Sequence, residues 1–466
     1  MVANVITYRA RSVLQDVGKS FGLTQAQVNA LTKYLDTRSP KAIRDEVELP
    51  AGLTTELIYD VCHRLDGFPR HLGIHSGGMV VAKRPLWEVV PLEWGRMEDR
   101  SVLQWDKDDC AAMGIVKFDL LALGALNGLH LSVDAISEVH GIDIDLATIP
   151  QEPVIYDMLT RADTVGVFQV ESRAQMATLP KMKPRTFYDL AIEVALIRPG
   201  PIQGHSVHPF LRRRNGEEPV RYPHPSTTPI LEKTLGVPVF QEQLMELARI
   251  CAGFTAGQSD RLRQAMTHKR SDEAMAKLRD EVYAGMAGND VLGAAADEIW
   301  EKLQGFASFG FPESHSVSFA YIVYASSWLK YHWPTEFFMG LLNAQPMGFY
   351  SPNSLVQDAI HHGVIVLPPD INQSWFDCTV EPYPSDHHEV EYLGMRWRLG
   401  SGAASDPARM PAALRIGLRY VRNLGDAEIT RIEAARMTAG PFATASDLAH
   451  RTGLPLDAIE ALAASG

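Results

Sequence analysis

An alternation of apolar and polar side chains marks residues 114–121, which read Gly-Ile-Val-Lys-Phe-Asp-Leu-Leu. Side chains on a strand point alternately to its two faces, so this pattern predicts a short strand with Lys117 and Asp119 side by side on one face. Burying either charge without a partner is costly. A divalent metal would suit Asp119 and a phosphate would suit Lys117. An ion pair between the two on an edge strand is the simpler alternative.

Helical spacing of apolar residues is typical of most of the remaining chain. Residues 1 to about 65 are predicted to be helical, with Thr24 and Gln27 at the two positions of a capping box. A further helix is predicted from Thr54 to Leu65, ending at Gly67. Another apolar repeat follows residue 125 and should end at Gly141, a typical C-terminal cap.

Two later segments place polar or basic residues at predicted helix starts. Residues 259–270 form a basic helix that Ser259 could cap. A small-polar cluster around His315 opens an apolar helix, and the N–H groups of a helix start attract anions. Simple capping by Ser314 or Ser316 is the alternative for that cluster.

From Arg415 onward the pattern changes to small helical hairpins with tight glycine turns. One predicted turn contains Asn423, Leu424 and Gly425. The exposed N–H groups of such turns could hold phosphates in a backbone nest.

A pair of glycines precedes the apolar run at residues 79–81 and predicts a tight turn that enters a strand. Arg70, His71 and His75 flank this turn. Each histidine could instead be a hydrogen-bonded structural residue.

Composition and charge narrow the class of protein. The 466 residues are 46% hydrophobic and 21% charged, which fits an ordinary globular protein of about three domains. No apolar stretch of about 18 residues predicts a membrane span, and the first residues do not resemble a signal peptide. The four cysteines lack metal-site spacing and suggest a reduced, cytoplasmic setting. The net charge of −12 argues mildly against a polyanionic partner without excluding a local basic groove.

Taken together, these stretches resemble the bacterial C-family DNA polymerases, the alpha subunits of polymerase III. The match rests on residues 114–121, 75–78, 168–173, 198–201, 241–243 and 309–315. The error-prone, damage-associated branch of the family is the most similar, with its marks at residues 6–12, 201–204 and 312–315.

The resemblance implies an α+β fold with a partial polymerase-beta-like palm. Residues 1–68 would be a thumb-like helical segment and residues 69–124 the second half of the palm. Residues 125–400 would form large, mainly helical fingers, and residues 401–466 a helix-hairpin-helix DNA-binding module.

The resemblance also implies site residues and partners for template-directed nucleotidyl transfer in repair and translesion synthesis. Asp119 matches a catalytic, metal-binding carboxylate. Four residues match positions near the incoming nucleotide, namely Lys117, Arg198, Arg263 and His315, and five match DNA contacts, namely Arg70, His75, Asn423, Leu424 and Gly425. Primer-template DNA and dNTPs are the implied partners. A sliding clamp and damage-tolerance accessory proteins are further candidate partners, and no membrane is implied.

The departures from the family pattern concern metal and triphosphate binding. Transfer through two Mg²⁺ ions needs several carboxylates, and the family takes two of its three from an Asp-x-Asp motif in the first half of the palm, which the resemblance places shortly before residue 1 of this sequence. The metal site is therefore expected to be incomplete and the chain alone inactive. Gln264 and Glu313 replace cations that are frequent in the family. A non-catalytic DNA-binding chain, or one chain of a split polymerase, is the alternative function.

Overall fold

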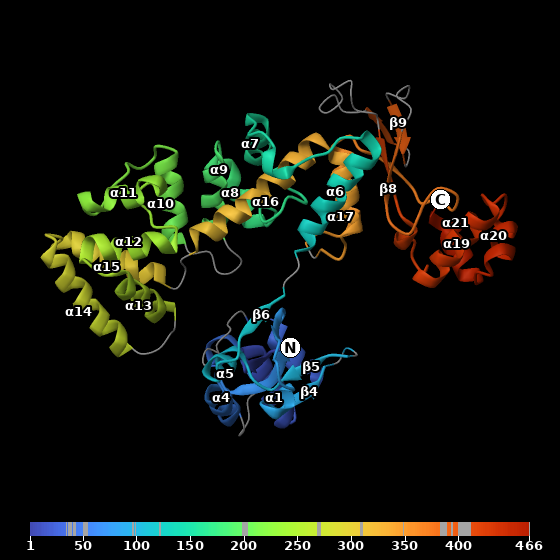
Figure 1. The fold of residues 1–466 in the computed structure, drawn as a ribbon. Coiled ribbons are helices and arrows are strands. Elements are labelled where there is room, and N and C mark those ends of the chain that lie inside the picture. Colours follow the sequence, from blue (N-terminus) through green and yellow to red (C-terminus); the bar gives the residue numbers. More distant parts are fainter. Residues whose placement is uncertain are drawn as a thin grey trace. The chain divides into compact units, whose positions relative to one another are not determined.

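The computed structural model describes most of the chain in two compact units, Met1–Ala122 and Leu123–Gly466, and each is described here by itself (Figure 1). The described residues are 1–33, 35, 40, 43–49, 55–95, 97, 99–120, 123–197, 204–267, 272–307, 311–347, 349–382, 389–392, 395–398 and 412–465. Within them, only the backbone is described at 204–208, 263–267, 272–277, 305–307, 389–392 and 395–398.

The first unit combines short helices with three two-stranded antiparallel sheets. Its elements are β1 (Ala3–Thr7), α1 (Ala10–Ser20), α2 (Gln25–Lys33), α3 (Ile43–Glu46), α4 (Thr55–Arg64), β2 (Pro69–Ile74), β3 (Gly78–Val80), the 3-10 turn η2 (Leu86–Glu88), β4 (Leu92–Trp94), β5 (Ser101–Leu103), α5 (Lys107–Ala112) and β6 (Lys117–Asp119). The strand pairs are β1–β2, β3–β6 and β4–β5.

Two apolar cores support the sheets of this unit. Helices α1 and α4 pack on each other through buried residues that include Leu14, Ile58 and Cys62. The second core gathers Val2, Val90, Leu103 and Cys110 beneath β3 and β5. The amino-terminal segment is therefore not wholly helical as predicted. Residues 3–7 pair with β2 instead, because the antiparallel ladder satisfies the backbone N–H and C=O groups of both strands.

The second unit is mainly helical. Its helices are α6 (Gly124–His140), α7 (Pro153–Thr160), α8 (Arg173–Met182), α9 (Phe187–Leu196), α10 (Gly204–Arg214), α11 (Thr228–Leu231), α12 (Gln241–Ala252), α13 (Ala256–Thr267), α14 (Asp272–Gly288), α15 (Ala294–Ala307), α16 (Glu313–His332), α17 (Pro334–Asn343), α18 (Pro352–His361), α19 (Asp426–Ala439), α20 (Ala445–Thr452) and α21 (Leu456–Ser465). Its strands and 3-10 turns are η3 (Leu146–Thr148), η4 (Pro225–Thr227), η5 (Glu232–Thr234), β7 (Ile365–Leu367), β8 (Thr379–Pro382), β9 (Glu389–Tyr392), β10 (Met395–Arg398), β11 (Ala412–Arg415) and η6 (Leu418–Tyr420).

The long helix α16 connects the packing of this unit, because it contacts α6, α7, α9 and α17. Its buried residues occur all around its axis, which is typical of a helix enclosed by others. Further along the chain, β11 lies between β7, its parallel neighbour, and β8, its antiparallel neighbour. Helices α19, α20 and α21 follow and share one apolar core.

Most of the predicted helix ends are observed. Gln27 and Thr24 form the predicted capping box, and Gly141 ends α6 in the left-handed conformation with φ 66°. Helix α4 (Thr55–Arg64) lies within the predicted 54–65 helix and ends before the predicted Gly67. The predicted cap at Ser259 is wrong, since α13 begins one turn earlier and Thr255 forms a capping pair with Gln258 instead.

The capping alternative proposed for the His315 cluster is also wrong. Helix α16 starts at Glu313 after Pro312, which offers no side-chain cap, and the N–H of Glu313 donates to the carboxylate of Glu242 instead of to a serine. The hydroxyl of Ser316 is buried and donates to the carbonyl of Ala191 on α9. This serine therefore fastens two helices rather than closing a helix end.

Candidate functional site

The predicted strand at residues 114–121 is shorter in the structure and is confirmed only for β6. Gly114 takes a left-handed conformation with φ 68°, so the extended segment begins later than predicted. In the antiparallel pair with β3, Asp119 lies opposite Gly78 and Lys117 lies opposite Val80. The two charged side chains share one face, and Lys117 Nζ lies 2.5 Å from Asp119 Oδ1.

The double glycine allows this close packing. A Cβ atom at Gly78 would lie 2.8 Å from Nδ1 of His75 and 3.0 Å from Cδ of Lys117. The Nδ1 atom of His75 accepts hydrogen bonds from the backbone N–H groups of Gly77 and Gly78, at 3.2 and 2.7 Å. These bonds hold the turn in place and leave Nε2 to carry the ring proton, and the DNA contact predicted for His75 stays a prediction.

The electrostatics of this face favour an ionised carboxylate. The hydrogen bond from Lys117 is the main reason that the pKa of Asp119 is lowered, and the charge on Lys117 adds to it. The side chain of Asp119 is 48% exposed. An exposed, ionised carboxylate is a suitable ligand for Mg²⁺, so Asp119 fits as one ligand of the metal that the resemblance implies.

In the described part of the chain, Asp119 belongs to no group of three or more potential metal ligands. There, the three ligand atoms that lie within 4.8 Å of one another belong to Asp163, Asp358 and His362, not to Asp119. Two metal ions held about 4 Å apart would need ligands from outside the described residues.

The predicted DNA contact at Arg70 has an internal partner. Its guanidinium makes two hydrogen bonds to the carboxylate of Asp16 on α1, at 2.8 and 3.3 Å. This bond is the main reason that the pKa of Asp16 is lowered. The pair connects β2 to α1 near the surface and leaves part of Arg70 exposed.

His315 stands on the first turn of α16 in a row of aromatic rings. Its ring centroid lies 4.2 Å from that of Phe319 and 5.0 Å from that of Phe311. The ring of Phe168, from the loop before α8, meets Phe319 edge-on at 5.2 Å. His315 is exposed, so this row of four rings reaches solvent at its end.

Glu313, which replaces a frequent lysine of the family, is tied down at the start of α16. Its carboxylate accepts a hydrogen bond from the hydroxyl of Tyr188 at 2.6 Å. Its backbone N–H donates to Glu242 at 2.9 Å.

Two of the predicted nucleotide contacts cannot be compared with this geometry. The side chain of Arg263 on α13 and all of Arg198 lie outside what the structure describes.

The predicted phosphate-binding turn lies just before α19. Asn423 takes a left-handed conformation with φ 63°, Leu424 is buried in the core of the hairpins, and Gly425 is the N-terminal cap residue of α19. A Cβ atom at Gly425 would lie 2.7 Å from Oε2 of Glu428. The second turn has Gly453 in the left-handed conformation, with φ 61°, at the end of α20.

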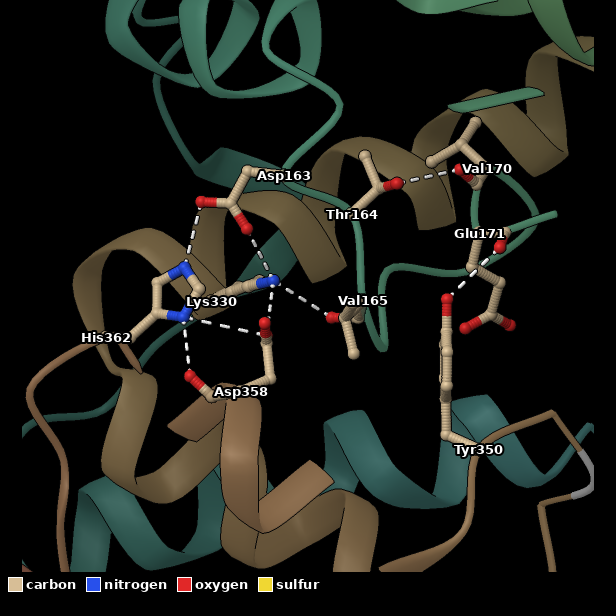
Figure 2. A network of polar contacts seen from close by, with 9 residues as sticks. All are labelled: Asp163, Thr164, Val165, Val170, Glu171, Lys330, Tyr350, Asp358 and His362. Carbon is tan, nitrogen blue, oxygen red and sulfur yellow. Dashed lines mark hydrogen bonds and ion pairs between the residues drawn. The ribbon is translucent and has the colours of Figure 1, made fainter. Parts of the chain in front are cut away.

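Sequence reasoning missed a cluster of charges in the second unit (Figure 2). The Nζ atom of Lys330 lies 2.8 Å from Oδ1 of Asp163 and 2.8 Å from Oδ2 of Asp358, and its side chain is fully buried. His362 Nε2 lies 2.8 Å from Oδ2 of Asp163. We call these four residues the Lys330 cluster. A signal was available, because Lys330 interrupts an apolar helix and a buried ammonium needs partners.

Comparisons with known proteins define the class. A model of the bacterial DNA polymerase III alpha NTPase domain matches residues 1–122, and one of the bacterial DNA polymerase III alpha subunit finger domain matches residues 125–290. A helix-hairpin-helix motif matches residues 363–466. The chain therefore belongs to the bacterial DNA polymerase III alpha subunit family, as the resemblance predicted.

Curated relatives specify the branch. The chain is 52% identical over 470 residues to a protein named Error-prone DNA polymerase from Mycolicibacterium paratuberculosis. It is 52% and 50% identical, each over 467 residues, to proteins of the same name from Mycobacterium tuberculosis (strain ATCC 25618 / H37Rv) and Nocardia farcinica. The alignments cover 100% of this chain and 40%, 40% and 38% of those relatives. Among the described residues, no helix is long and apolar enough to cross a membrane.

Proposed function

We propose that this chain provides part of the active centre and of the DNA-contact surface of an error-prone DNA polymerase. The reaction is template-directed nucleotidyl transfer from dNTPs during repair and translesion synthesis. Residues 1–68 act as a thumb, 69–124 as half of a palm, 125–400 as fingers and 401–466 as a hairpin module. The observation that supports this most directly is the exposed, ionised Asp119 beside Lys117 on β6.

Asp119 would bind one or both Mg²⁺ ions, which align the primer 3′ oxygen with the α-phosphate and neutralise charge there. Lys117 would stay beside it and turn its ammonium toward a triphosphate oxygen, since Nζ needs only a small rotation to exchange one anionic partner for another. His315 would contact the incoming nucleotide from the fingers. The remaining metal ligands would come from outside the described residues.

The second candidate is a DNA-binding chain without catalysis of its own, or one chain of a split polymerase. It is favoured by the absence of Asp119 from every group of three or more potential metal ligands in the described residues. Both functions share the DNA surface, including Arg70, His75 and the turn at residues 423–425. They differ in whether Asp119 is needed for phosphoryl transfer. Binding of a sliding clamp or of damage-tolerance proteins would be compatible with either.

A hybrid polymerase separates the two functions. This chain replaces the matching 470-residue region of the Mycolicibacterium paratuberculosis relative. We expect metal-dependent primer extension by the hybrid and a loss of about 10²-fold or more in Asp119→Asn, because a main source of transition-state charge stabilisation is removed. Asp60→Asn, at an exposed position of α4, is the control and should extend primers normally. If the Asp119→Asn hybrid extends primers at the rate of the unsubstituted hybrid, Asp119 takes no part in the reaction.

A further inference from the structure

The loop between α7 and α8 is held in an unusual conformation. Ala162 and Gln169 are non-glycine residues in the left-handed region, with φ 58° and 66°. Such residues persist when surrounding contacts over-determine the backbone. In this loop, the hydroxyl of Thr164 donates to the carbonyl of Val170 at 2.9 Å, so the loop is closed on itself.

Helix α16 fastens the same loop at several points. Lys330 Nζ donates to the carboxylate of Asp163 and, at 3.0 Å, to the carbonyl of Val165 (Figure 2). The N–H of Phe168 donates to the hydroxyl of Ser326 at 3.2 Å. The loop in turn presents the ring of Phe168 to Phe319, the neighbour of His315. The position of this loop therefore determines one end of the aromatic row.

The hydrogen bonds of His362 indicate its charge. Its Nδ1 atom lies 2.7 Å from the backbone carbonyl of Asp358, and its Nε2 atom lies 2.8 Å from the carboxylate of Asp163. Both partners are acceptors, so both ring nitrogens must donate, and only the imidazolium has two N–H groups. A ring that donates at both nitrogens has no lone pair for a metal, so we treat the Lys330 cluster as an ion-pair cluster.

We propose that Lys330 and His362 form a pH-dependent latch that positions the loop 163–171 on α16, firmly in mildly acidic solution and more loosely in alkaline solution. When the imidazolium loses a proton, one of its two contacts becomes a contact between acceptors. The loop then keeps Lys330 as its charged partner but loses the bond between His362 and Asp163. This inference does not depend on polymerase activity.

The described groups that face His362 are consistent with a protonated ring held by the loop. Asp163 comes from the loop, Lys330 from α16, Asp358 from its own helix, and α17 contributes the uncharged ring of Phe338. Burial and the charge on Lys330 work against a charge on His362, but the hydrogen bonds to Asp163 and to the backbone of Asp358, together with the charge on Asp163, outweigh them and raise the pKa of the ring. Burial also opposes ionisation of Asp163, but its bonds to His362 and Lys330 lower its pKa overall.

Glu171 acts in the same direction as His362. Burial raises the pKa of its carboxyl to about 7. The Tyr350 hydroxyl, which donates to the carbonyl of Glu171, keeps its proton in this range, because burial raises its pKa to about 12. Below neutral pH, two carboxylates face one ammonium and one imidazolium, and Glu171 is uncharged. Above neutral pH Glu171 is negative, and once the pH also exceeds the raised pKa of His362 the ring is neutral, so two negative charges have no compensation.

The sign follows from these shifts. A group whose pKa is higher in the closed loop than in the open loop favours closure at low pH and loses that contribution as pH rises. As pH rises from the ordinary pKa of Glu171 to about 7, the contribution of Glu171 to loop closure is lost. The contribution of His362 is lost as pH rises through its raised pKa. Both changes loosen the loop toward alkaline pH.

Hydrogen–deuterium exchange of the whole 466-residue chain tests the latch. After correction for intrinsic exchange, we expect protection of residues 163–171 to fall about tenfold between about pH 6 and pH 8.5, the effect of one pKa unit, while α12 stays constant. In His362→Asn, protection at pH 6 should be lower than in the unchanged chain, and the fall that remains toward pH 8.5 should be that of Glu171 alone. Glu171→Gln should raise protection at pH 8.5. His361→Asn changes the exposed neighbouring histidine and should behave as the unchanged chain does.

Three outcomes would overturn the proposal. One is protection of residues 163–171 that does not change with pH in the unchanged chain, a result that needs no variant to fold. Another is an equal effect of His361→Asn and His362→Asn. The third is protection that rises when Zn²⁺ is added and does so only with Asp163 intact, which would make the cluster a metal site.

Discussion

The Nζ atom of Lys330 and the Oδ2 atom of Asp358 lie 2.8 Å apart, and the lysine side chain has no exposed surface. A second carboxylate, that of Asp163, lies at the same distance from Nζ. Removing one partner of a buried ion pair leaves the others without compensation.

Lys330→Met should therefore lower the free energy of unfolding of the second unit by about 3–5 kcal/mol. Lys302→Met is the control, since Lys302 pairs on α15 with a half-exposed Glu298 and should change stability by about 1 kcal/mol or less. Urea unfolding followed by circular dichroism measures both. Equal stability of the two variants would contradict the role of the Lys330 cluster in folding.

A second buried charge should make stability depend on pH. Glu193 on α9 is fully buried, neither carboxyl oxygen has a hydrogen-bond partner among the described residues, and burial raises its pKa to about 8. In the unfolded chain this group ionises near pH 4.5, so its contribution to stability falls as pH rises from there to about 8. The fall is about 1.4 kcal/mol for each pKa unit.

Glu193→Gln should remove this loss, and the variant should be more stable than the unchanged chain at pH 8 by a few kcal/mol. Urea unfolding at several pH values between 5 and 8 gives the comparison. Glu246→Gln, at an exposed position of α12, is the matched control. Parallel stability curves for the unchanged chain and Glu193→Gln would mean that Glu193 is ionised in the folded chain.

Lys117 should set the acid limit of nucleotidyl transfer in the hybrid polymerase. Because its hydrogen bond is the main cause of the lowered pKa of Asp119, Lys117→Met should move that pKa up toward the ordinary value. Asp119 must be ionised to bind metal, so activity should begin to fall at a higher pH. The measurement is the pH–rate profile of primer extension. Lys117→Arg keeps a cation and should shift the acid limb less.

The hairpin module should bind DNA through phosphates, without sequence preference and with a steep dependence on salt. Arg422 is exposed next to the turn at Asn423. Arg422→Glu should weaken binding of primer-template DNA in fluorescence anisotropy and lower the salt slope by about 1. Arg249→Glu on α12 is the control, because it makes the same charge change away from the turn and should leave DNA binding stronger than Arg422→Glu does. If both variants bind equally, the hairpin turn is not a DNA contact.

A point variant is preferable to removal of residues 405–466, because the structure places β11 inside that segment. Ala413 and Leu414 of β11 are fully buried between β7 and β8. Truncation there would expose this sheet, so weaker DNA binding by the shortened chain could result from misfolding rather than from the loss of DNA contacts.

The sequence predicted local features well wherever one residue type has few alternatives. Gly141 ends α6, Thr24 and Gln27 cap α2, and the strand with Lys117 and Asp119 forms, although it is shorter than predicted. These features depend on backbone conformation and on side chains within a few residues of each other, and the residue types in a short stretch of sequence determine both. The family itself was also recognisable, since its motifs extend over most of the chain.

Distant contacts were decided by the tertiary structure alone. No local pattern indicates that residues 3–7 pair with β2, or that Asp163 meets His362 across 199 positions. Such contacts depend on which helices and strands pack together, because burial and charge compensation act on all neighbours in space at once. The sequence determined the family and the candidate carboxylate Asp119. Only the fold determined which charges are buried, and with which partners.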